Sequence, residues 1–149
     1  MKRGISALYA RTFCHATEDI DKVRAALTNA FGDCDIEVHR TAGHHGNPLS
    51  VLECSVQDGA GIFAFFSKLA EDDMRQLLRT LDERIDGDCN LFLRVDKQLA
   101  YQGIIKTASG EDVLSVRAKV QSFPARRENA VEAAGEYLTG VLERVKASS

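Results

Sequence analysis

The sequence predicts an α+β fold: a mainly antiparallel sheet with helices packed on one face, in the order βαββααβββα. Two kinds of periodicity lead to this prediction, because stretches in which apolar and polar residues alternate are interspersed with stretches in which apolar residues recur at helical spacing. Short connections rich in glycine separate them. A length of 149 residues suits one domain, so we expect residues 1–149 to fold together.

The first part of the chain is expected to form a strand, a helix and a β-hairpin. Residues 5–14 are rich in apolar, aromatic and β-branched side chains, which favours a strand. Thr17 is the expected N-cap of a helix over about 18–30, because two acidic residues and then an apolar stripe follow it. Strands over about 34–42 and 49–57 come next, and a glycine-containing segment connects them as a hairpin.

The middle of the chain has a helical pattern from about 61 to 85. It is expected to break near Ala70, because the acidic run Glu71-Asp72-Asp73 is typical of a second helix start. Its apolar stripe consists of Phe63, Phe66, Leu69, Met74, Leu77, Leu78 and Leu81. We therefore expect two helices packed on the sheet.

The last part is expected to form a three-stranded meander and a closing helix. Leu91, Leu93 and Val95 alternate with polar or aromatic residues, which is typical of a half-buried strand. Further strands are predicted over about 99–106 and 112–121, separated by a turn at Ala108-Ser109-Gly110. Pro124 ends the last strand, and a helix is predicted over about 126–145.

Composition narrows the function classes. The formal net charge is −3, yet residues 51–90 hold 4 Lys/Arg against 9 Asp/Glu, a balance of −5 that leaves +2 for the rest. A basic surface is therefore expected on one side only. No apolar run approaches the roughly 20 residues that span a bilayer, and we interpret the N-terminus as a strand start rather than a signal peptide. The four cysteines form no C-x-x-C pair, which indicates free thiols in a reducing cytoplasm.

Three of the predicted strands would place cations and aromatic rings on the face opposite the core. The side chains that share this face are Tyr9, Arg11 and Phe13, then Phe92 and Arg94, then Arg117, Lys119 and Gln121. Cations contact phosphates and aromatic rings stack on bases, so this interleaving favours RNA or another single-stranded nucleic acid. The alternative is that the rings belong to the core or to a dimer interface and the cations to a solvated face.

Two further groups extend the basic surface. Lys97 and Gln98 would lie at its edge with Tyr101 as an additional ring, unless they form only a turn and Tyr101 joins the core. Arg126 and Arg127 follow Pro124 near a predicted helix start, where free backbone N–H groups favour anions. The alternative for this pair is an ordinary exposed first turn.

The segment GHHGNP contains two imidazoles and an amide, from His44, His45 and Asn47. Its glycines and histidines could donate to a phosphate or a sugar, or it could be a plain hairpin turn with surface histidines. A metal site is disfavoured, because adjacent histidines on a tight turn seldom reach one ion and no Asp, Glu or Cys lies at a familiar ligand spacing.

Enzymatic function has little support. A histidine-dependent metalloenzyme would rest only on His15, His39, His44 and His45. The cysteines lie at predicted strand ends where a small hydrophobic residue would serve, which disfavours cysteine–histidine catalysis. The chain has no nucleophile elbow, phosphate-binding glycine loop or zinc-hydrolase motif. We expect no catalytic activity, no cofactor and no metal.

Several ordered segments resemble a known family: YARTFCHATED, GHHGNP, LDERID, RVDKQLAYQG and KVQSFPARRE. From about Ala7 to Leu138 the chain resembles archaeal proteins described as predicted exosome-associated RNA-binding proteins. The resemblance implies a fold similar to the ribosomal protein that binds five-S ribosomal RNA. It also implies RNA binding tied to RNA processing, degradation or ribosome assembly.

Assigning RNA contacts to residues is our inference from their chemistry, since the resemblance carries no catalytic residues. The expected contacts are Arg11, His15, His44, His45, Asn47, Arg94, Lys97, Gln98, Arg117, Lys119, Arg126 and Arg127. The chain is thus expected to be a cytoplasmic, non-catalytic RNA-binding domain whose partners are RNA and exosome or ribosomal components, with no membrane. The alternative, motivated by the acidic segment 51–90, is a protein-interaction adaptor or homodimer that does not bind RNA directly.

Overall fold

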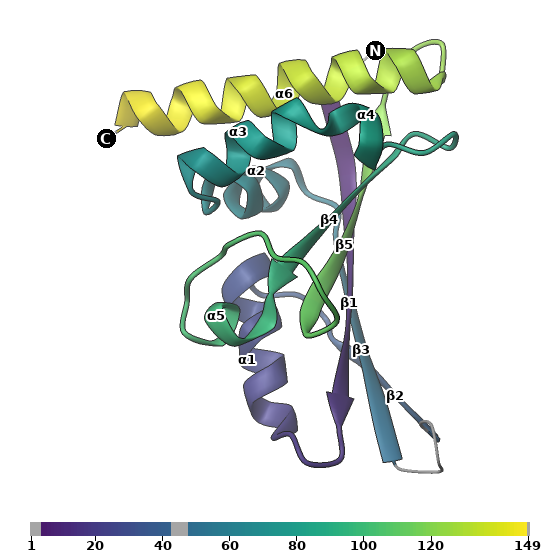
Figure 1. The fold of residues 1–149 in the computed structure, drawn as a ribbon, viewed down its shortest axis with the longest axis vertical. Coiled ribbons are helices and arrows are strands. Elements are labelled where there is room, and N and C mark those ends of the chain that lie inside the picture. The colour runs from purple at the N-terminus through teal and green to yellow at the C-terminus, as the bar shows by residue number, and fades with distance from the viewer. Residues whose placement is uncertain (1–3, 43–47, 149) are drawn as a thin grey trace.

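The structure is a computed structural model and describes residues 4–42 and 48–148. In these residues five strands form one antiparallel sheet in the order β2-β3-β1-β5-β4 (Figure 1). The strands are β1 (Gly4–His15), β2 (Glu37–Ala42), β3 (Pro48–Val56), β4 (Asn90–Asp96) and β5 (Val113–Gln121). The predicted α+β class and the predominantly antiparallel pairing are confirmed.

The helices lie on one side of the sheet, and the longest of them crosses one end of it (Figure 1). They are α1 (Ile20–Phe31), α2 (Gly59–Ser67), α3 (Glu71–Arg79), α4 (Leu81–Arg84), α5 (Lys97–Tyr101) and α6 (Arg127–Ser148). The predicted single covered face is therefore confirmed. Among the described residues, no helix is long and apolar enough to cross a membrane.

Alternation along the strands decides which side chains enter the core. On β1, Leu8 and Ala10 are buried, whereas Arg11 and Phe13 are exposed. The helices supply large apolar side chains to the same core, such as Phe65, which stacks on Phe31 with ring centroids 4.9 Å apart. Each fully buried side chain of this size contributes roughly 1.5–3 kcal/mol relative to an exposed one. The face opposite the helices receives none of these contacts.

Helix starts follow local capping chemistry. The cap of α1 is Asp19, whose carboxylate accepts the Asp21 N–H at 2.9 Å, so the predicted cap at Thr17 was wrong by two residues. The predicted break near Ala70 is confirmed, since α2 ends at Ser67 and α3 begins at Glu71. The acidic first turn of α3 suits the positive end of the helix dipole.

The predicted strand over 99–106 was wrong. Residues 97–101 form α5 instead, because the Asp96 carboxylate accepts the Leu99 N–H at 2.8 Å and starts a helix directly after β4. Only a remnant of strand pairing follows, as the Thr107–Val95 bridge and the Asp96 N–H bond to the Lys106 carbonyl at 2.9 Å. β4 therefore pairs directly with β5.

Lys97 anchors α5 to the sheet. Its ammonium lies 2.9 Å from Glu18 Oε2 and 2.9 Å from Asp112 Oδ1, and it donates to the Phe13 carbonyl at 2.9 Å. Only 5% of the side chain is exposed. Although burial alone would lower the pKa of Lys97, its bonds to the Glu18 and Asp112 carboxylates hold it above the ordinary value. The hydrogen bond between Lys97 and Asp112 also lowers the pKa of Asp112. This lysine begins α5. Its contacts thus join α5 to three other parts of the chain: β1, the turn that precedes α1, and the start of β5.

We predict that Lys97→Met lowers the free energy of unfolding by about 2 kcal/mol at neutral pH, because charge-assisted bonds to the ammonium are lost. The loss is limited because the Asp112 side chain is 57% exposed and can regain water. Urea unfolding measures the effect, with Lys119→Met on the exposed side of β5 as the matched control. Equal stability of Lys97→Met and the natural sequence would contradict this anchoring role.

Acid should remove part of the same interaction. Since the pKa of Asp112 is lowered on folding, its contribution is present above the ordinary aspartate value near 3.9 and is lost as the pH falls through the folded value. The stability gap between the natural protein and Lys97→Met should therefore be constant near neutral pH and narrow below about pH 4. A gap that widens in acid would contradict the assignment.

Candidate functional site

The open face of the sheet carries the predicted cations and rings together. On the three strands from the centre of the sheet to one edge, β1, β5 and β4, Tyr9 lies opposite Arg117, and Arg117 lies opposite Phe92. Arg11 and Arg94 flank Ser115 in the next row of the sheet. The residues expected to share this face, Tyr9, Arg11, Phe13, Phe92, Arg94, Arg117, Lys119 and Gln121, do share it. We call this surface, formed by β1, β5 and β4, the open face.

Two arginines on the open face rest on aromatic rings. The Arg117 guanidinium carbon lies 4.6 Å from the centroid of the Tyr9 ring, and that of Arg11 lies 5.4 Å from the centroid of Phe13. Each cation–π contact contributes about 0.5–1 kcal/mol at an exposed site. Because a ring binds the flat side of the guanidinium and consumes no N–H donor, the donors stay available to a phosphate or carboxylate.

Charge is unevenly distributed across this side of the sheet. Arg11 Nε lies 4.0 Å from Glu53 Oε1, and Glu53 lies opposite Glu37 of β2. These side chains, together with Tyr9 and Arg117, line a hollow of about 650 Å³. One wall is cationic and aromatic, from β1, β5 and β4, and the other is acidic, from β2 and β3. An anionic ligand is therefore directed toward the open face and away from β2 and β3.

The acidic segment 51–90 lies mostly elsewhere. Glu71 of α3 pairs with Arg75 at 3.2 Å, and Asp73 of the same helix accepts the Thr107 N–H at 3.2 Å. Asp58 caps α2 by accepting the Gly61 N–H at 2.8 Å. These carboxylates serve the helical layer on the covered side of the sheet. Glu53 of β3 is the member of the segment that pairs with an arginine of the open face.

Lys97 and Gln98 do not extend the basic edge as predicted. Lys97 is buried in its ion pairs, so its charge is already neutralised by carboxylates. Gln98 is exposed and donates to Asp112 Oδ2 at 3.0 Å. His15 is exposed at the end of β1, and its backbone N–H donates to Glu18 Oε1 at 3.1 Å. This group is separate from the row of arginines, and Lys97 is removed from the candidate contacts.

Arg126 and Arg127 differ although they are neighbours. Arg127 begins α6, as the sequence suggests, but its guanidinium donates to the backbone carbonyls of Ile85, at 3.0 Å, and of Asp82. It therefore joins α6 to the end of α4, which is a structural task. Arg126 is exposed. The predicted anion site at this helix start retains Arg126 and loses Arg127.

The loop residues His44, His45 and Asn47 lie outside the described residues. The strands before and after them pair antiparallel, with Ala42 opposite Pro48, so the predicted hairpin of β2 and β3 is confirmed. Within the described parts of the chain, no group of three or more His, Cys, Asp or Glu side chains could hold a metal ion. All four cysteines are free, as predicted.

Sequence reasoning missed three residues around the open face. Ser115 lies between Arg11 and Arg94, and its position two residues before Arg117 could have revealed it by alternation. Glu53 could have been found in the same way, from its alternation with Leu52 and Cys54. Arg84 carries no such signal, because it lies in the four-residue helix α4 and reaches β4 only through the fold.

Comparison with known proteins gives consistent matches. A family model described as RNA binding matches residues 7–120. The RNA-binding protein PAB1135 of Pyrococcus abyssi is 38% identical over 140 residues, which cover 87% of this chain and 91% of that protein. The structure of Mth689, a DUF54 protein from Methanothermobacter thermautotrophicus, is 30% identical with a TM-score of 0.79, covering 95% of this chain and 99% of that one. SSO0741 from Sulfolobus solfataricus, also DUF54, shares the fold at 22% identity, with a TM-score of 0.70 and coverage of 96% and 99%.

We predict that Glu53→Gln strengthens the binding of single-stranded RNA roughly threefold at low salt. A unit charge about 4 Å from Arg11 is worth up to about 1 kcal/mol in water, and salt reduces this further. Fluorescence anisotropy measures the effect. The control is Glu143→Gln on α6, which changes the net charge equally at an exposed position away from the sheet. The same gain in both variants would show that net charge, rather than the position of Glu53, sets the affinity.

Proposed function

Because the chain belongs to the RNA-binding family, we propose that the open face of β1, β5 and β4 is its RNA-contacting surface and that the protein binds RNA without catalysing a reaction. One observation carries the proposal: Arg117 on Tyr9 and Arg11 on Phe13 are guanidinium–ring pairs on the sheet face opposite all the described helices. Phe92, with 44% of its surface exposed, adds a ring to the same face.

Each component has a defined task in this binding mode. Arg11, Arg94, Arg117 and Lys119 contact phosphates, which fixes the RNA backbone on the sheet. Exposed rings stack on bases, at about 1–3 kcal/mol for each stacked base. Neither kind of contact reads base edges, so we expect tolerance of sequence.

The remaining expected contacts are kept in the proposal because their side chains can form hydrogen bonds or ion pairs with RNA. His15, Gln98 and Arg126 are exposed and could reach an RNA that extends beyond the open face. His44, His45 and Asn47 are retained as hydrogen-bonding groups of the hairpin segment. Lys97 and Arg127 are not retained, since their charges serve the fold.

We further propose that residues 1–149 act as one RNA-binding domain in the cytoplasm, accessory to RNA processing or degradation by the exosome or to ribosome assembly. The support is the resemblance of the ordered segments from about Ala7 to Leu138, and the free thiols of the four cysteines suit a reducing compartment.

The test is anisotropy of untagged protein with a labelled single-stranded RNA at about 50 and 200 mM salt. Four cations on phosphates give a slope of log affinity against log salt near −2.8 for a single strand, so affinity should fall roughly 50-fold over this range. Arg94→Gln, Arg117→Gln and Lys119→Gln should each reduce the slope by about 0.7.

The matched control is Arg24→Gln on the exposed side of α1, which should leave the slope unchanged. Absence of binding at low salt would overturn the proposal and leave a protein-interaction adaptor or homodimer as the explanation. Equal effects of Arg24→Gln and the three open-face variants would show that the contacts lie on another surface.

A further inference from the structure

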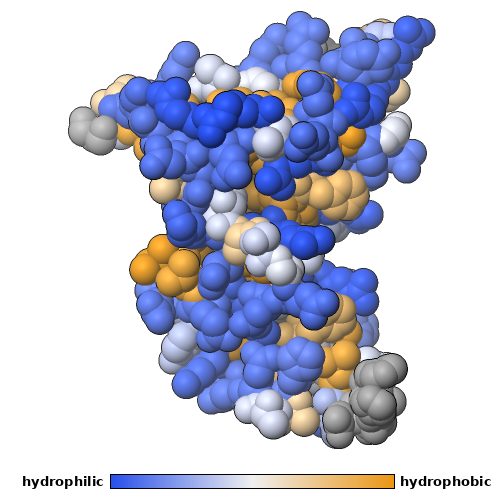
Figure 2. Space-filling model, viewed as in Figure 1, coloured by the Kyte–Doolittle hydropathy of each residue, from blue (hydrophilic) through white to orange (hydrophobic). Residues whose placement is uncertain are grey.

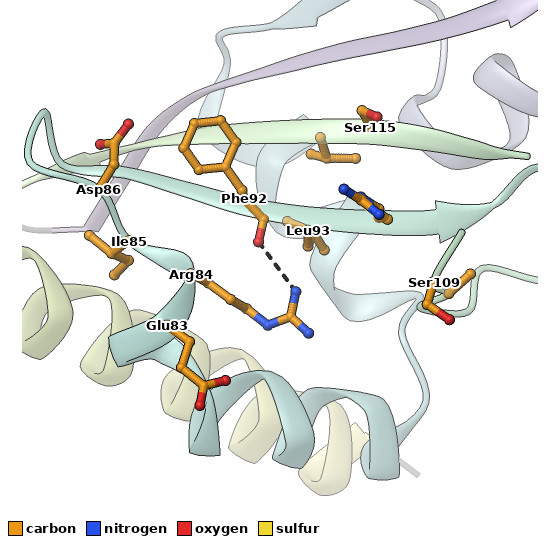
Figure 3. Close-up of a pocket in the computed structure, with 11 residues that line it drawn as sticks. Glu83, Arg84, Ile85, Asp86, Phe92, Leu93, Ser109 and Ser115 are labelled. Carbon is orange, nitrogen blue, oxygen red and sulfur yellow. Dashed lines mark hydrogen bonds between the residues drawn. The ribbon is translucent and has the colours of Figure 1, made fainter. Parts of the chain in front are cut away.

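A cavity of about 610 Å³ lies along the outer edge of β4 (Figure 3). Its lining includes Arg84 from α4, Phe92 and Arg94 from β4, Ser109 from the loop before β5, and Ser115 from β5. In Figure 3 the Arg84 side chain extends from α4 toward β4, and the ring of Phe92 projects from the opposite side of that strand. The cavity thus joins the edge of the sheet to its open face.

The cavity exists because the edge of β4 is covered only at its two ends. At one end the Asp86 N–H donates to the Asn90 carbonyl at 3.0 Å. At the other end the Ala108 N–H donates to the Arg94 carbonyl at 2.9 Å. Between them, the Phe92 carbonyl meets only the Arg84 guanidinium, at 3.4 Å, among the described residues. The middle of the edge is therefore left open to a ligand.

Both arginines of the cavity are positioned by neutral groups. Arg84 Nε donates to Thr80 Oγ1 at 2.8 Å, and Arg94 donates to the Gly110 carbonyl at 3.3 Å. In the parts of the chain that the structure describes, neither arginine forms an ion pair. Two carboxylates, of Glu83 and Asp86, also line the cavity. The Glu83 side chain extends from α4 away from β4 (Figure 3), and Asp86 Oδ1 already accepts the N–H groups of Asp88 and Asn90 at 2.9 Å each. The cavity therefore keeps two cations whose charge an anion can neutralise.

The ring of Phe92 differs from the other rings of the open face. Tyr9 and Phe13 each have a guanidinium over the ring, whereas among the described residues neither a cation nor a second ring is paired with Phe92. Phe92 also lines both this cavity and the hollow at the centre of the sheet. A free aromatic ring at the rim of a cavity with two arginines matches the parts of a nucleotide, which are a flat base and a phosphate.

We propose that this cavity binds one unpaired nucleotide of a single-stranded RNA, with the base stacked on Phe92 and a phosphate held by Arg84 and Arg94. The hydroxyls of Ser109 and Ser115 are then available to the sugar. The inference rests on the proposed RNA-binding function and specifies its substrate class. A base inside a duplex is stacked on its neighbours and paired, so it cannot enter the cavity, and paired RNA is restricted to phosphate contacts on the open face.

The sequence offers a direct probe, because it contains no tryptophan. The variant Phe92→Trp in the full chain should lose much of its tryptophan fluorescence when a single-stranded oligonucleotide binds, as base stacking quenches the indole, and should change little with a blunt duplex of the same length. The control is Phe123→Trp, at a ring that is 73% exposed and outside the cavity, and it should respond weakly to both RNAs.

Anisotropy on the same samples separates the two proposals. RNA binding that depends on salt but leaves Phe92→Trp fluorescence unchanged would overturn the subsite and leave the proposed function intact. Equal quenching by single strand and duplex would also overturn it. Absence of binding to any RNA by the natural protein would overturn the function itself.

A second pair of variants tests the contacts independently of fluorescence. Phe92→Ala should weaken single-strand binding 5- to 150-fold, the range that corresponds to one stacked base at about 1–3 kcal/mol, while duplex binding stays nearly constant. Arg84→Gln should weaken single-strand binding more than duplex binding. A loss that is equal for both RNA forms in both variants would contradict a site for an unpaired nucleotide.

Discussion

Coverage of the sheet on one face only determines where the arginines and rings of the open face lie. Because strand side chains alternate between faces, each strand that buries Leu8, Leu93 or Val116 toward the helices must present its intervening residues on the other side. Those intervening residues are the arginines and rings of the open face. Viewed across the sheet edge, the surface is mainly hydrophilic with small separate hydrophobic patches (Figure 2). The packing that stabilises the fold therefore also displays the candidate site.

This alternation is also the reason that the open face could be predicted from the sequence. Its period of two is a local property, so Arg117 and Lys119 were placed together without knowledge of the pairing partner. The structure adds the register, which brings Tyr9 under Arg117 and Phe92 beside it. Pairing across strands decides which ring meets which cation, and a single sequence contains no direct signal for it.

The residues that were misplaced are those whose environment is set by distant contacts. Lys97 has the same local appearance as an exposed basic residue at a strand end, but Glu18, 79 residues away, makes it a buried anchor. Asp96 ends β4 and caps α5 at once, which a strand pattern over 99–106 could not reveal. Arg127 was correctly placed at a helix start, yet its guanidinium donates to the backbone carbonyl of Ile85 and is not free for an anion. Tertiary partners, rather than propensity, decided all three.

Tertiary structure also decides on which side of the sheet the acidic residues lie. The negative balance of residues 51–90 motivated the alternative of a protein-interaction surface, but most of those carboxylates belong to the helical layer on the covered side. Only the part of a sequence that faces a ligand contributes strongly to its local field, since exposed charges beyond about 10 Å are largely screened at ordinary salt.

The position of Phe92 relates the two hollows of the molecule to each other. Phe92 and Ser115 line both of them, so a chain that crosses the cationic wall of the open face reaches the edge of β4 at this ring. The central hollow offers guanidiniums already paired with rings, which suits a phosphate backbone. The edge cavity offers an unpaired ring and two arginines among its lining residues, which suits a single base with its phosphate. The proposed subsite would therefore make selectivity depend on whether the RNA can release a base at the edge of the sheet. Under the proposed binding mode the protein would distinguish RNA shapes without reading base edges, because its contacts would be made by arginines, rings and hydroxyls.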